Sequence, residues 1–281
     1  MPERPDLEYV VPILRGELVR CVLGAPRVRK PVVLRAMAGE LTGEVRSVER
    51  RGHTVVFGLG TMEMIVSPML AGRFQLVPVG TKDSADLALA WPLTPRSGDQ
   101  PRELRYRDDV QMGKVYLTKP GVLPPGLPTV GVDVLSLAFT VPVLAAVCKS
   151  RREQVKIVLM DKSALDAMGN AYADEVLWHA GIHPKIPASK LTAEQVRALH
   201  GAIVEVLTHA RDEIARRAPP LDEKLRDFLH VRGREGPCDR CGTGLRTLGV
   251  RGHDAYYCPK CQSEGGKVGI VDWNRLPGSI K

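Results

Sequence analysis

The chain has 281 residues, enough for one large or two ordinary domains, and its 44% hydrophobic content allows substantial buried cores. A net charge of +8 favours a polyanionic partner, although a basic soluble protein without such a partner would have the same charge. The aromatic content of 5% argues against extensive base stacking on aromatic side chains. The sequence contains no signal peptide and no apolar run near the roughly 18 residues of a membrane span, so we expect a cytoplasmic protein.

The first 130 residues are rich in short β-type runs separated by turns, which is typical of a sandwich or barrel. A short helix is predicted ahead of these runs at residues 6–14, and Pro12 should kink or end it. The predicted strands are 19–23, 43–49, 54–60, 63–67, 86–90, 103–107 and 113–117.

The Pro- and Gly-dense segment 118–131 is typical of a linker, and the apolar pattern after it becomes helical. Helices are predicted at 136–150, 171–180 and 193–217. Gly181 should stop the second, and Thr192 with Gln195 forms a capping box at the start of the third.

Four cysteines near the C-terminus form two C-x2-C pairs separated by sixteen residues. Each short pair lets two thiolates face one ion, and two pairs complete a tetrahedral all-sulfur shell, so we predict one structural zinc ion. Residues 247–250 and 255–257 between the pairs indicate a hairpin. The predicted ligands are Cys238, Cys241, Cys258 and Cys261.

The beginning of the chain carries a candidate nucleophile. Removal of Met1 would expose the secondary amine of Pro2, and an α-amino group with a pKa of about 7.7–8.0 is partly neutral at pH 7. Such an amine can attack an aldehyde or a sugar C1′, and the neighbouring Glu3 could transfer protons. Many proteins begin with Met-Pro, so these residues alone do not establish a catalytic site.

Three features occur in a fixed order: the start MPERPDLEYV, the run VKIVLMDKSALDAMGNAYADEVLWHAGIHP at 155–184, and the four-cysteine hairpin. Together they resemble the formamidopyrimidine-DNA glycosylase/endonuclease VIII family of base-excision repair enzymes over nearly the full chain. The 155–184 run, which is similar to the family's helix–two-turn–helix region, is the most specific of the three.

The resemblance implies an α+β multidomain fold with an N-terminal helix, a two-layer β-sandwich, a helical domain with a helix–two-turn–helix motif and a four-cysteine zinc finger. The expected divisions are a catalytic domain at 1–118, a linker at 119–131, a DNA-binding domain at 132–230 and a zinc-finger module at 231–281. We expect a monomer that associates with the nucleoid.

The resemblance also implies the chemistry. Pro2 resembles the family's nucleophile and Glu3 its proton-transfer carboxylate, so the implied activity is a DNA glycosylase with AP-lyase activity on damaged double- or single-stranded DNA. Asn170, Lys156 and Arg234 match DNA-contacting positions. We expect free N–H groups at the start of the 171–180 helix to help Asn170 bind a phosphate.

Two phosphate-contacting positions of the family carry histidine in this chain. His53 stands where the family has the lysine of RRGK, and His253 stands where the finger has an arginine. Since imidazole is only partly charged at pH 7, we expect weaker, pH-dependent anchoring. New roles in proton transfer or base recognition are the alternative.

Two further departures concern lesion recognition. The residues expected to fill the gap left by an everted base are Met69, Leu70, Gln111 and Met112. The segment 225–233 leads almost directly into the zinc module, without the long loop that covers the everted purine in the family's 8-oxoguanine enzymes.

We therefore expect a glycosylase that acts on a lesion other than 8-oxoguanine, either an oxidised pyrimidine or a ring-opened or bulky alkylated purine. The alternative is a catalytically weakened DNA-binding protein of the same fold, since several phosphate contacts are replaced. A zinc-ribbon interaction module without a nucleic-acid role is disfavoured by the basic charge and the matched run.

Overall fold

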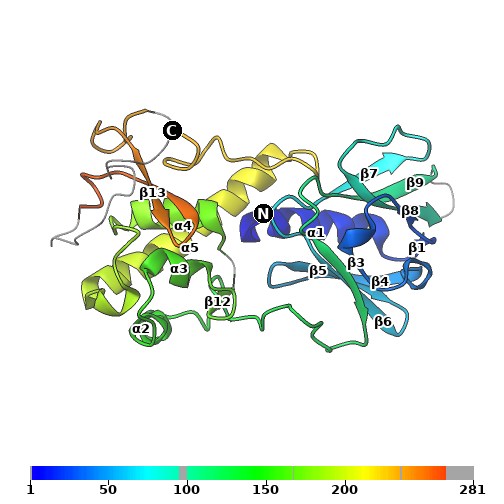
Figure 1. Cartoon of the computed structure of the whole chain (residues 1–281), viewed down its shortest axis with the longest axis horizontal. Coiled ribbons are helices and arrows are strands. Elements are labelled where there is room, and N and C mark those ends of the chain that lie inside the picture. The colour runs from blue at the N-terminus through cyan, green and yellow to red at the C-terminus, as the bar shows by residue number, and fades with distance from the viewer. Residues whose placement is uncertain (1, 95–99, 167, 235, 264–281) are drawn as a thin grey trace, which may run out of the picture.

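The computed structural model describes residues 2–94, 100–166, 168–234 and 236–263. The strands of the first half gather on one side of the molecule, and the later helices and the C-terminal hairpin gather on the other (Figure 1). Helix α1 (Arg4–Leu18) begins between the two groups, runs along the strands with its apolar face in their core, and packs against helix α5 (Ala193–Arg217). The N-terminus of the chain is thereby placed at the junction of the two halves.

Helix α1 is longer than predicted because Pro12 does not end it. The buried residues Leu7, Val11 and Leu14 form one face, whereas Pro12 is exposed on the opposite face. The missing N–H of a proline then affects a solvent-facing backbone group, which water can satisfy. Of the two expected effects of Pro12, a kink or the end of the helix, the second was wrong.

The N-terminal half contains a ten-stranded hydrogen-bonded sheet that forms the predicted β-sandwich around one apolar core. Its strand order is β3-β10-β6-β5-β4-β1-β8-β9-β7, with β2 paired to β8. The strands are β1 (Val22–Leu23), β2 (Arg27–Val28), β3 (Leu34–Arg35), β4 (Gly43–Arg51), β5 (Thr54–Leu59), β6 (Met62–Ser67), β7 (Arg73–Pro78), β8 (Leu87–Thr94), β9 (Arg102–Arg107) and β10 (Lys114–Thr118).

Strand β7 has no counterpart among the predicted strands. It lies at the end of the strand order and pairs only with β9, and it alternates Arg73 and Gln75 with the buried Phe74. An edge strand needs less continuous apolar character than a central one, so its sequence signal is weak. Two 3-10 turns, at Pro31–Val33 and Ala38–Glu40, connect the early strands.

The second half is helical and has a core of its own. It contains α2 (Val141–Lys149), α3 (Val155–Met160), α4 (Asn170–His179), a 3-10 turn (Ala188–Lys190), α5, and the short parallel pair β11 (Val132–Asp133) and β12 (Leu165–Asp166). The predicted capping box of α5 is confirmed, because Gln195 N donates to Thr192 Oγ1 at 3.2 Å and Thr192 N donates to Gln195 Oε1 at 2.9 Å.

The two separate cores support the expected division into domains, whose boundaries stay a prediction. The last described element is the hairpin of β13 (Arg246–Val250) and β14 (His253–Tyr257). None of the helices in the described ranges is long and apolar enough to cross a membrane.

Replacing Pro12 with alanine should stabilise the protein, because the new N–H can complete the helical ladder of α1 at an exposed position. We expect a gain of about 1–2 kcal/mol in the free energy of unfolding, reduced from the full helix penalty by the extra freedom of the unfolded chain. Urea unfolding would measure it. Gly16→Ala, at another exposed position of α1, should gain only about 0.5–1 kcal/mol, and a Pro12→Ala gain below that of Gly16→Ala would contradict this account.

Candidate active site and zinc centre

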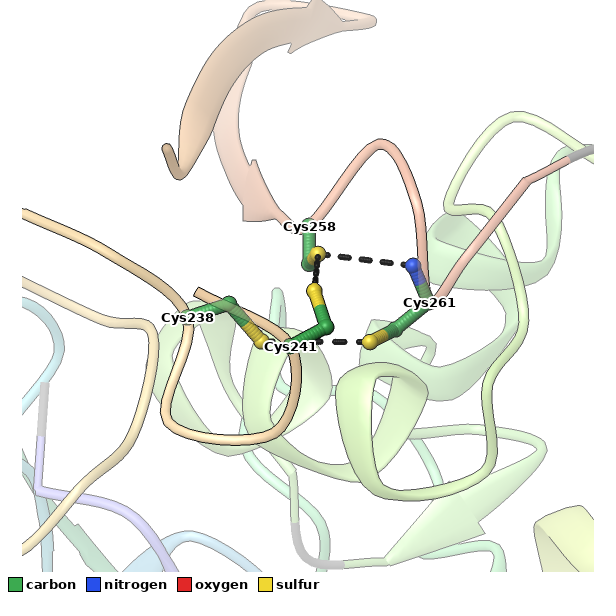
Figure 2. Close-up of side chains that lie close together, drawn as sticks. All are labelled: Cys238, Cys241, Cys258 and Cys261. Atoms are coloured by element: carbon green, nitrogen blue, oxygen red, sulfur yellow. Dashed lines mark hydrogen bonds between the residues drawn. The ribbon is translucent and has the colours of Figure 1, made fainter. Parts of the chain in front are cut away.

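The four predicted zinc ligands lie together in space (Figure 2). All four sulfur atoms fall within 4.8 Å of one another, with Sγ–Sγ distances of 3.9 Å for Cys238–Cys261 and 3.5 Å for Cys241–Cys258. A tetrahedral ion with Zn–S bonds of about 2.3 Å places its sulfur ligands about 3.8 Å apart, so the cluster fits one zinc ion. Because four thiolates fill the shell, the ion holds the fold together and leaves no position open for hydrolysis.

Helix α4 anchors this zinc centre to the helical domain. Trp178 Nε1 donates to Cys238 Sγ at 3.3 Å, and the guanidinium of Arg240 lies 4.0 Å from the centre of the Trp178 ring. On the other side, the buried Gln262 accepts from Cys258 N and donates from Nε2 to Ile182 O at 2.9 Å. The position of the metal is therefore tied to α4 and the turn that follows it.

The hairpin between the cysteine pairs turns at Arg251 and Gly252, whose φ angles of +45° and +82° are those of a tight two-residue turn. His253 is the first residue of β14 and pairs with Val250 across the turn. Its side chain is exposed. The turn thus holds His253 at the tip of the hairpin.

His253 borders a cleft of about 580 Å³ that also receives residues from the N-terminus and from α4. Leu70 reaches the cleft from the loop after β6, and Asn170 reaches it from the start of α4. The cleft brings together four predicted site residues from distant parts of the chain: Glu3, Leu70, Asn170 and His253. Its charged lining is otherwise mostly basic, from Lys162, Lys224, Arg226 and Arg232.

The Glu3 carboxylate sits on the N-terminus of α4. It accepts hydrogen bonds from the backbone N–H groups of Gly169 at 2.7 Å, Ala171 at 3.1 Å and Tyr172 at 3.2 Å. The partial positive charge of the helix start favours a carboxylate there. Gly169 is required by this contact, because a Cβ at this position would lie 2.7 Å from the Glu3 carboxyl carbon.

This contact corrects one expectation. We expected the N–H groups at the start of α4 to be free for a phosphate, but Glu3 occupies three of them. The side-chain Oδ1 of Asn170 is buried and has no hydrogen-bond partner among the described residues. The amide side chain of Asn170 therefore remains available to a ligand in the cleft.

A second carboxylate positions the same N-terminal segment. Asp6 Oδ2 accepts from Glu3 N at 2.7 Å, and both Asp6 oxygens accept from Arg226, at 2.9 and 2.6 Å. The guanidinium of Arg226 also lies 4.9 Å from the centre of the Tyr172 ring. Arg226 was missed in the sequence because it lies in an irregular segment, where only its charge distinguishes it.

Pro2 is buried beside a small cavity that it shares with Asp6 and Lys224. Lys224 borders both this cavity and the cleft, and its Nζ donates to Leu70 O at 3.2 Å. Burial lowers the pKa of Lys224 below the ordinary lysine value. The structure therefore places Pro2 and Glu3 where a basic cleft meets the N-terminus of the chain.

The segment 225–233 connects the helical core directly to the zinc module. Leu229 is buried in the helical core, and two residues later Val231 is buried in the apolar cluster around the zinc ligands. The described chain has no long loop over the cleft at this place, as the sequence indicated.

Comparison with known proteins settles the family. Residues 130–216 match the model of the formamidopyrimidine-DNA glycosylase H2TH domain, and residues 236–263 match that of the zinc finger found in FPG and IleRS. A formamidopyrimidine-DNA glycosylase of Symbiobacterium thermophilum is 32% identical, with 99% of this chain and 94% of that protein covered. One of Geobacillus kaustophilus is 31% identical, with 93% and 100% covered.

The chain belongs to the formamidopyrimidine-DNA glycosylase family. It is thus a DNA glycosylase of base excision repair. A structure titled as a complex of Lactococcus lactis Fpg with DNA containing an abasic site has a TM-score of 0.81 and 23% identity, covering 93% of this chain and all of that one. A complex of the LlFpg protein with THF-DNA and an inhibitor has a TM-score of 0.84 and 23% identity over 94% and 100%, which confirms the fold.

Lys156 was expected to contact DNA, but the structure buries its side chain. Its side chain is 0% exposed, and Nζ donates to Asp174 Oδ1 and to Asp254 O, both at 2.5 Å. Arg232 donates to Asp174 Oδ2 at 3.1 Å. The buried ammonium group therefore fastens the zinc hairpin to α4, and its burial argues against a phosphate contact.

The remaining predicted contacts lie at the surface but do not all meet at one place. Arg234 is exposed and bonds Asp239 at 2.5 Å. Leu70 is 53% exposed, whereas Met69 borders a different cavity. Gln111 and Met112 are exposed in the loop before β10, which Asp108 holds by accepting from Gln111 N at 2.9 Å. The structure brings only Leu70 of the four wedge candidates to the cleft.

His53 is buried at the junction of the two domains in this glycosylase. It is 7% exposed, and its Nδ1 lies 3.5 Å from Asp166 Oδ1. Arg50 donates to the other oxygen of Asp166 at 2.7 Å and to Asp133 at 3.2 Å. Arg4 also pairs with Asp133, so arginines of the sandwich domain meet aspartates of the helical domain around the His53 ring.

Burial lowers the pKa of His53 below the ordinary histidine value, and the neighbouring Asp166 only partly offsets this effect. For Asp166, burial raises the pKa, but His53 and Arg50 outweigh it and lower the pKa below the ordinary aspartate value. At neutral pH the imidazole is neutral beside a carboxylate. Such a group does not suit the expected electrostatic anchoring of a phosphate, and the expectation for His53 is corrected accordingly.

Acid should destabilise the folded protein through His53. Because the folded-state pKa lies below that of the unfolded chain, the unfolded state binds more protons as the pH falls below about 6.5. Lowering the pH from 7 to 5 should therefore reduce the free energy of unfolding of the wild type relative to that of His53→Gln, by at most about 1.4 kcal/mol per pH unit.

Urea unfolding of both proteins at several pH values would measure this difference, in which the titrations of carboxylates that do not contact His53 cancel. The control variant is His209→Gln, which removes one imidazole ring at an exposed position. A difference that stays constant, or that moves in favour of the wild type, would refute the buried neutral state of His53.

Proposed function

We propose that this glycosylase removes a damaged base through a Schiff base on Pro2 and then cleaves the strand at the resulting abasic site. The observation that carries the proposal is the position of Glu3, which is held by three N–H groups of the α4 N-terminus next to the buried Pro2. A carboxylate fixed beside a terminal amine is suited to moving protons at that amine.

In this mechanism, removal of Met1 frees the secondary amine of Pro2. The damaged nucleotide leaves the base stack, and the amine nitrogen forms a bond to C1′ while the bond from C1′ to the base breaks. The base departs with a proton, and the C1′–O4′ bond of the resulting aminal then breaks as O4′ gains a proton, which opens the sugar ring and leaves an iminium. Loss of a proton from C2′ then expels the 3′ phosphate by β-elimination, with Glu3 as the group that transfers protons.

The cleft supplies the DNA contacts in this proposal. Its basic side chains would neutralise backbone phosphates of double- or single-stranded DNA, with Asn170 and His253 as further polar contacts. Leu70, exposed at the edge of the cleft, is the side chain that would fill the space left by the everted base. The monomeric state and a location on the nucleoid in the cytoplasm stay predictions.

We further propose that the preferred lesion is not 8-oxoguanine. The short 225–233 connection leaves the cleft without a covering loop, so the site imposes fewer contacts on the everted base. An oxidised pyrimidine or a ring-opened or bulky alkylated purine would be accepted. The relatives are named for formamidopyrimidines, which are ring-opened purines, and this favours the second class.

Borohydride trapping on an oligonucleotide with an abasic site tests the nucleophile. The Met1-processed protein should form a covalent adduct, and a protein with one extra residue before Pro2 should form none, because its amine is displaced from Glu3. Pro2→Gly, which keeps a terminal amine, is the matched control and should retain part of the adduct. If the protein binds the DNA but no adduct appears, the alternative of a catalytically weakened DNA-binding protein gains support.

A lesion panel tests the substrate. In single-turnover assays, a ring-opened guanine should be excised at least about tenfold faster than 8-oxoguanine, the range expected when a pocket loses specific contacts to one base. Equal rates, or faster removal of 8-oxoguanine, would refute the proposed preference.

Removal of zinc should abolish DNA binding before it unfolds the sandwich domain. The hairpin that carries His253 depends on the metal, whereas the sandwich has a separate core. Titration of the wild-type protein with a chelator, followed by DNA-binding anisotropy and by hydrogen exchange of the sandwich strands, would separate the two events. Normal binding by the metal-free protein would contradict the proposed role of the finger.

A further inference from the structure

Of the described residues, only Lys224 borders both the cleft and the small cavity at Pro2. The cavity has a volume of about 20 Å³, which is enough for a single water molecule. Side chains that border so small a space lie within about 8 Å of one another. Lys224 is therefore a close neighbour of the chain terminus.

The side chain of Lys224 is held in this place by the loop after β6. Its Nζ donates to Leu70 O at 3.2 Å, and Gly72, two residues further along the loop, borders the Pro2 cavity. In the described part of the chain Lys224 forms no ion pair with a carboxylate, and a backbone oxygen does not neutralise an ammonium group. A fixed positive charge thus lies beside the N-terminus.

The carboxylates around Pro2 already have partners. Glu3 accepts three hydrogen bonds from the N-terminus of α4, and both oxygens of Asp6 accept from Arg226. Glu223, the other carboxylate at the cavity, is exposed, so water screens its charge. The charge of Lys224 is therefore not cancelled by an acidic neighbour.

The other titratable groups around Pro2 and Lys224 are paired, neutral or further away. Arg73 borders the cavity and donates to Asp86 at 3.2 Å. Burial raises the pKa of the Tyr172 phenol, which therefore stays neutral. Burial lowers the pKa of Lys224, and Asp6 opposes this effect. The titratable side chains that border the cleft but not the cavity are Asp161, Lys162, Arg226, Arg232 and His253.

A positive charge at this place affects the nucleophile directly. Only an unprotonated secondary amine has a lone pair with which to attack C1′. A neighbouring ammonium group disfavours the protonated amine and so lowers its pKa. For unit charges at about this separation and an effective dielectric constant of about 20–40, the effect is on the order of one pH unit.

We propose that Lys224 is a positioning residue whose charge holds the Pro2 amine in its neutral, nucleophilic form near neutral pH. This inference rests on the proposed function, in which Pro2 forms the Schiff base. Lys224 acts on the reaction through the amine, and it needs no contact with the reacting sugar.

The test is the pH dependence of adduct formation by the Met1-processed protein on an abasic duplex, with cyanoborohydride as the trapping reagent. Lys224→Met removes the charge and keeps an apolar stem of similar length. The acid limb of its single-turnover rate profile should move up by about one pH unit, with a rate about tenfold lower on that limb. The rates of the two proteins should approach each other toward about pH 9, where the amine is neutral in both.

Two further variants separate charge from structure. Lys224→Arg keeps the positive charge and should keep the midpoint of the acid limb within about 0.3 pH unit of the wild type. Lys162→Met removes an ammonium group that borders the cleft but not the Pro2 cavity. It should weaken DNA binding without moving the midpoint by more than about 0.3 pH unit.

An NMR titration measures the same pKa without DNA. In protein labelled with carbon-13 at proline, the ring signals of Pro2 report the protonation of the terminal amine. The pKa of this amine should be about one unit higher in Lys224→Met than in the wild type, and nearly unchanged in Lys162→Met.

The outcomes separate the two hypotheses. If the wild-type protein forms the adduct but Lys224→Met has the wild-type pH profile, Lys224 has no influence on the amine and the proposed function stands. An equal shift in Lys162→Met would assign the effect to the summed charge of the cleft, and would also overturn the role of Lys224. If the wild-type protein forms no adduct at any pH, the proposed function is wrong and the role of Lys224 falls with it.

Discussion

The hydrogen bonds from the start of α4 to the Glu3 carboxylate connect the two halves of this molecule. Glu3 belongs to the N-terminal domain, and α4 belongs to the helical domain that carries the zinc centre. The contact uses the helix N-terminus to hold the Glu3 carboxylate, and it requires a residue without a side chain at Gly169. Each half therefore contributes an incomplete part of the site, and their docking assembles it.

A set of buried charges supports the same docking. Arg4 and Arg50 come from the sandwich, and they bind Asp133 and Asp166 of the helical domain. Arg50 and Asp166 are both largely buried, and removing one partner of such a pair costs about 3–5 kcal/mol, so the junction resists separation. The pairs also hold Asp133 and Asp166 beside Arg50. The junction thus serves alignment as much as stability.

The sequence predicted those parts of the protein that local patterns determine. Spacing alone identified the zinc ligands, and the 3.6-residue period with its capping box defined α5. Long-range contacts were not visible in the same way. The burial of Lys156 depends on the hairpin about a hundred residues later, and the burial of His53 depends on Asp166 from another domain. A single sequence shows the residue type at each position but not which distant group will surround it.

The partners of helix termini were also not predictable from the sequence. The sequence correctly placed the beginning of α4 at the site, but the partner of its N–H groups is a carboxylate 166 residues earlier rather than a ligand. Propensity rules describe an isolated helix, whereas the hydrogen-bond partners of its terminal N–H groups depend on which other segment packs against that end. The same limit explains why Pro12 was expected to end α1, since only the fold reveals that this face is in solvent.

The buried Lys156 has a mechanical consequence. Its ammonium group donates to the backbone oxygen of Asp254, the residue after His253, and to the Asp174 carboxylate of α4. Tilting the hairpin toward DNA would separate a buried charge from its partners, which makes the finger a rigid arm. The bending needed to seat DNA against this finger would then occur in the duplex. Damaged sites that bend easily would be bound in preference to stiff, intact DNA, and discrimination would begin before any base is contacted.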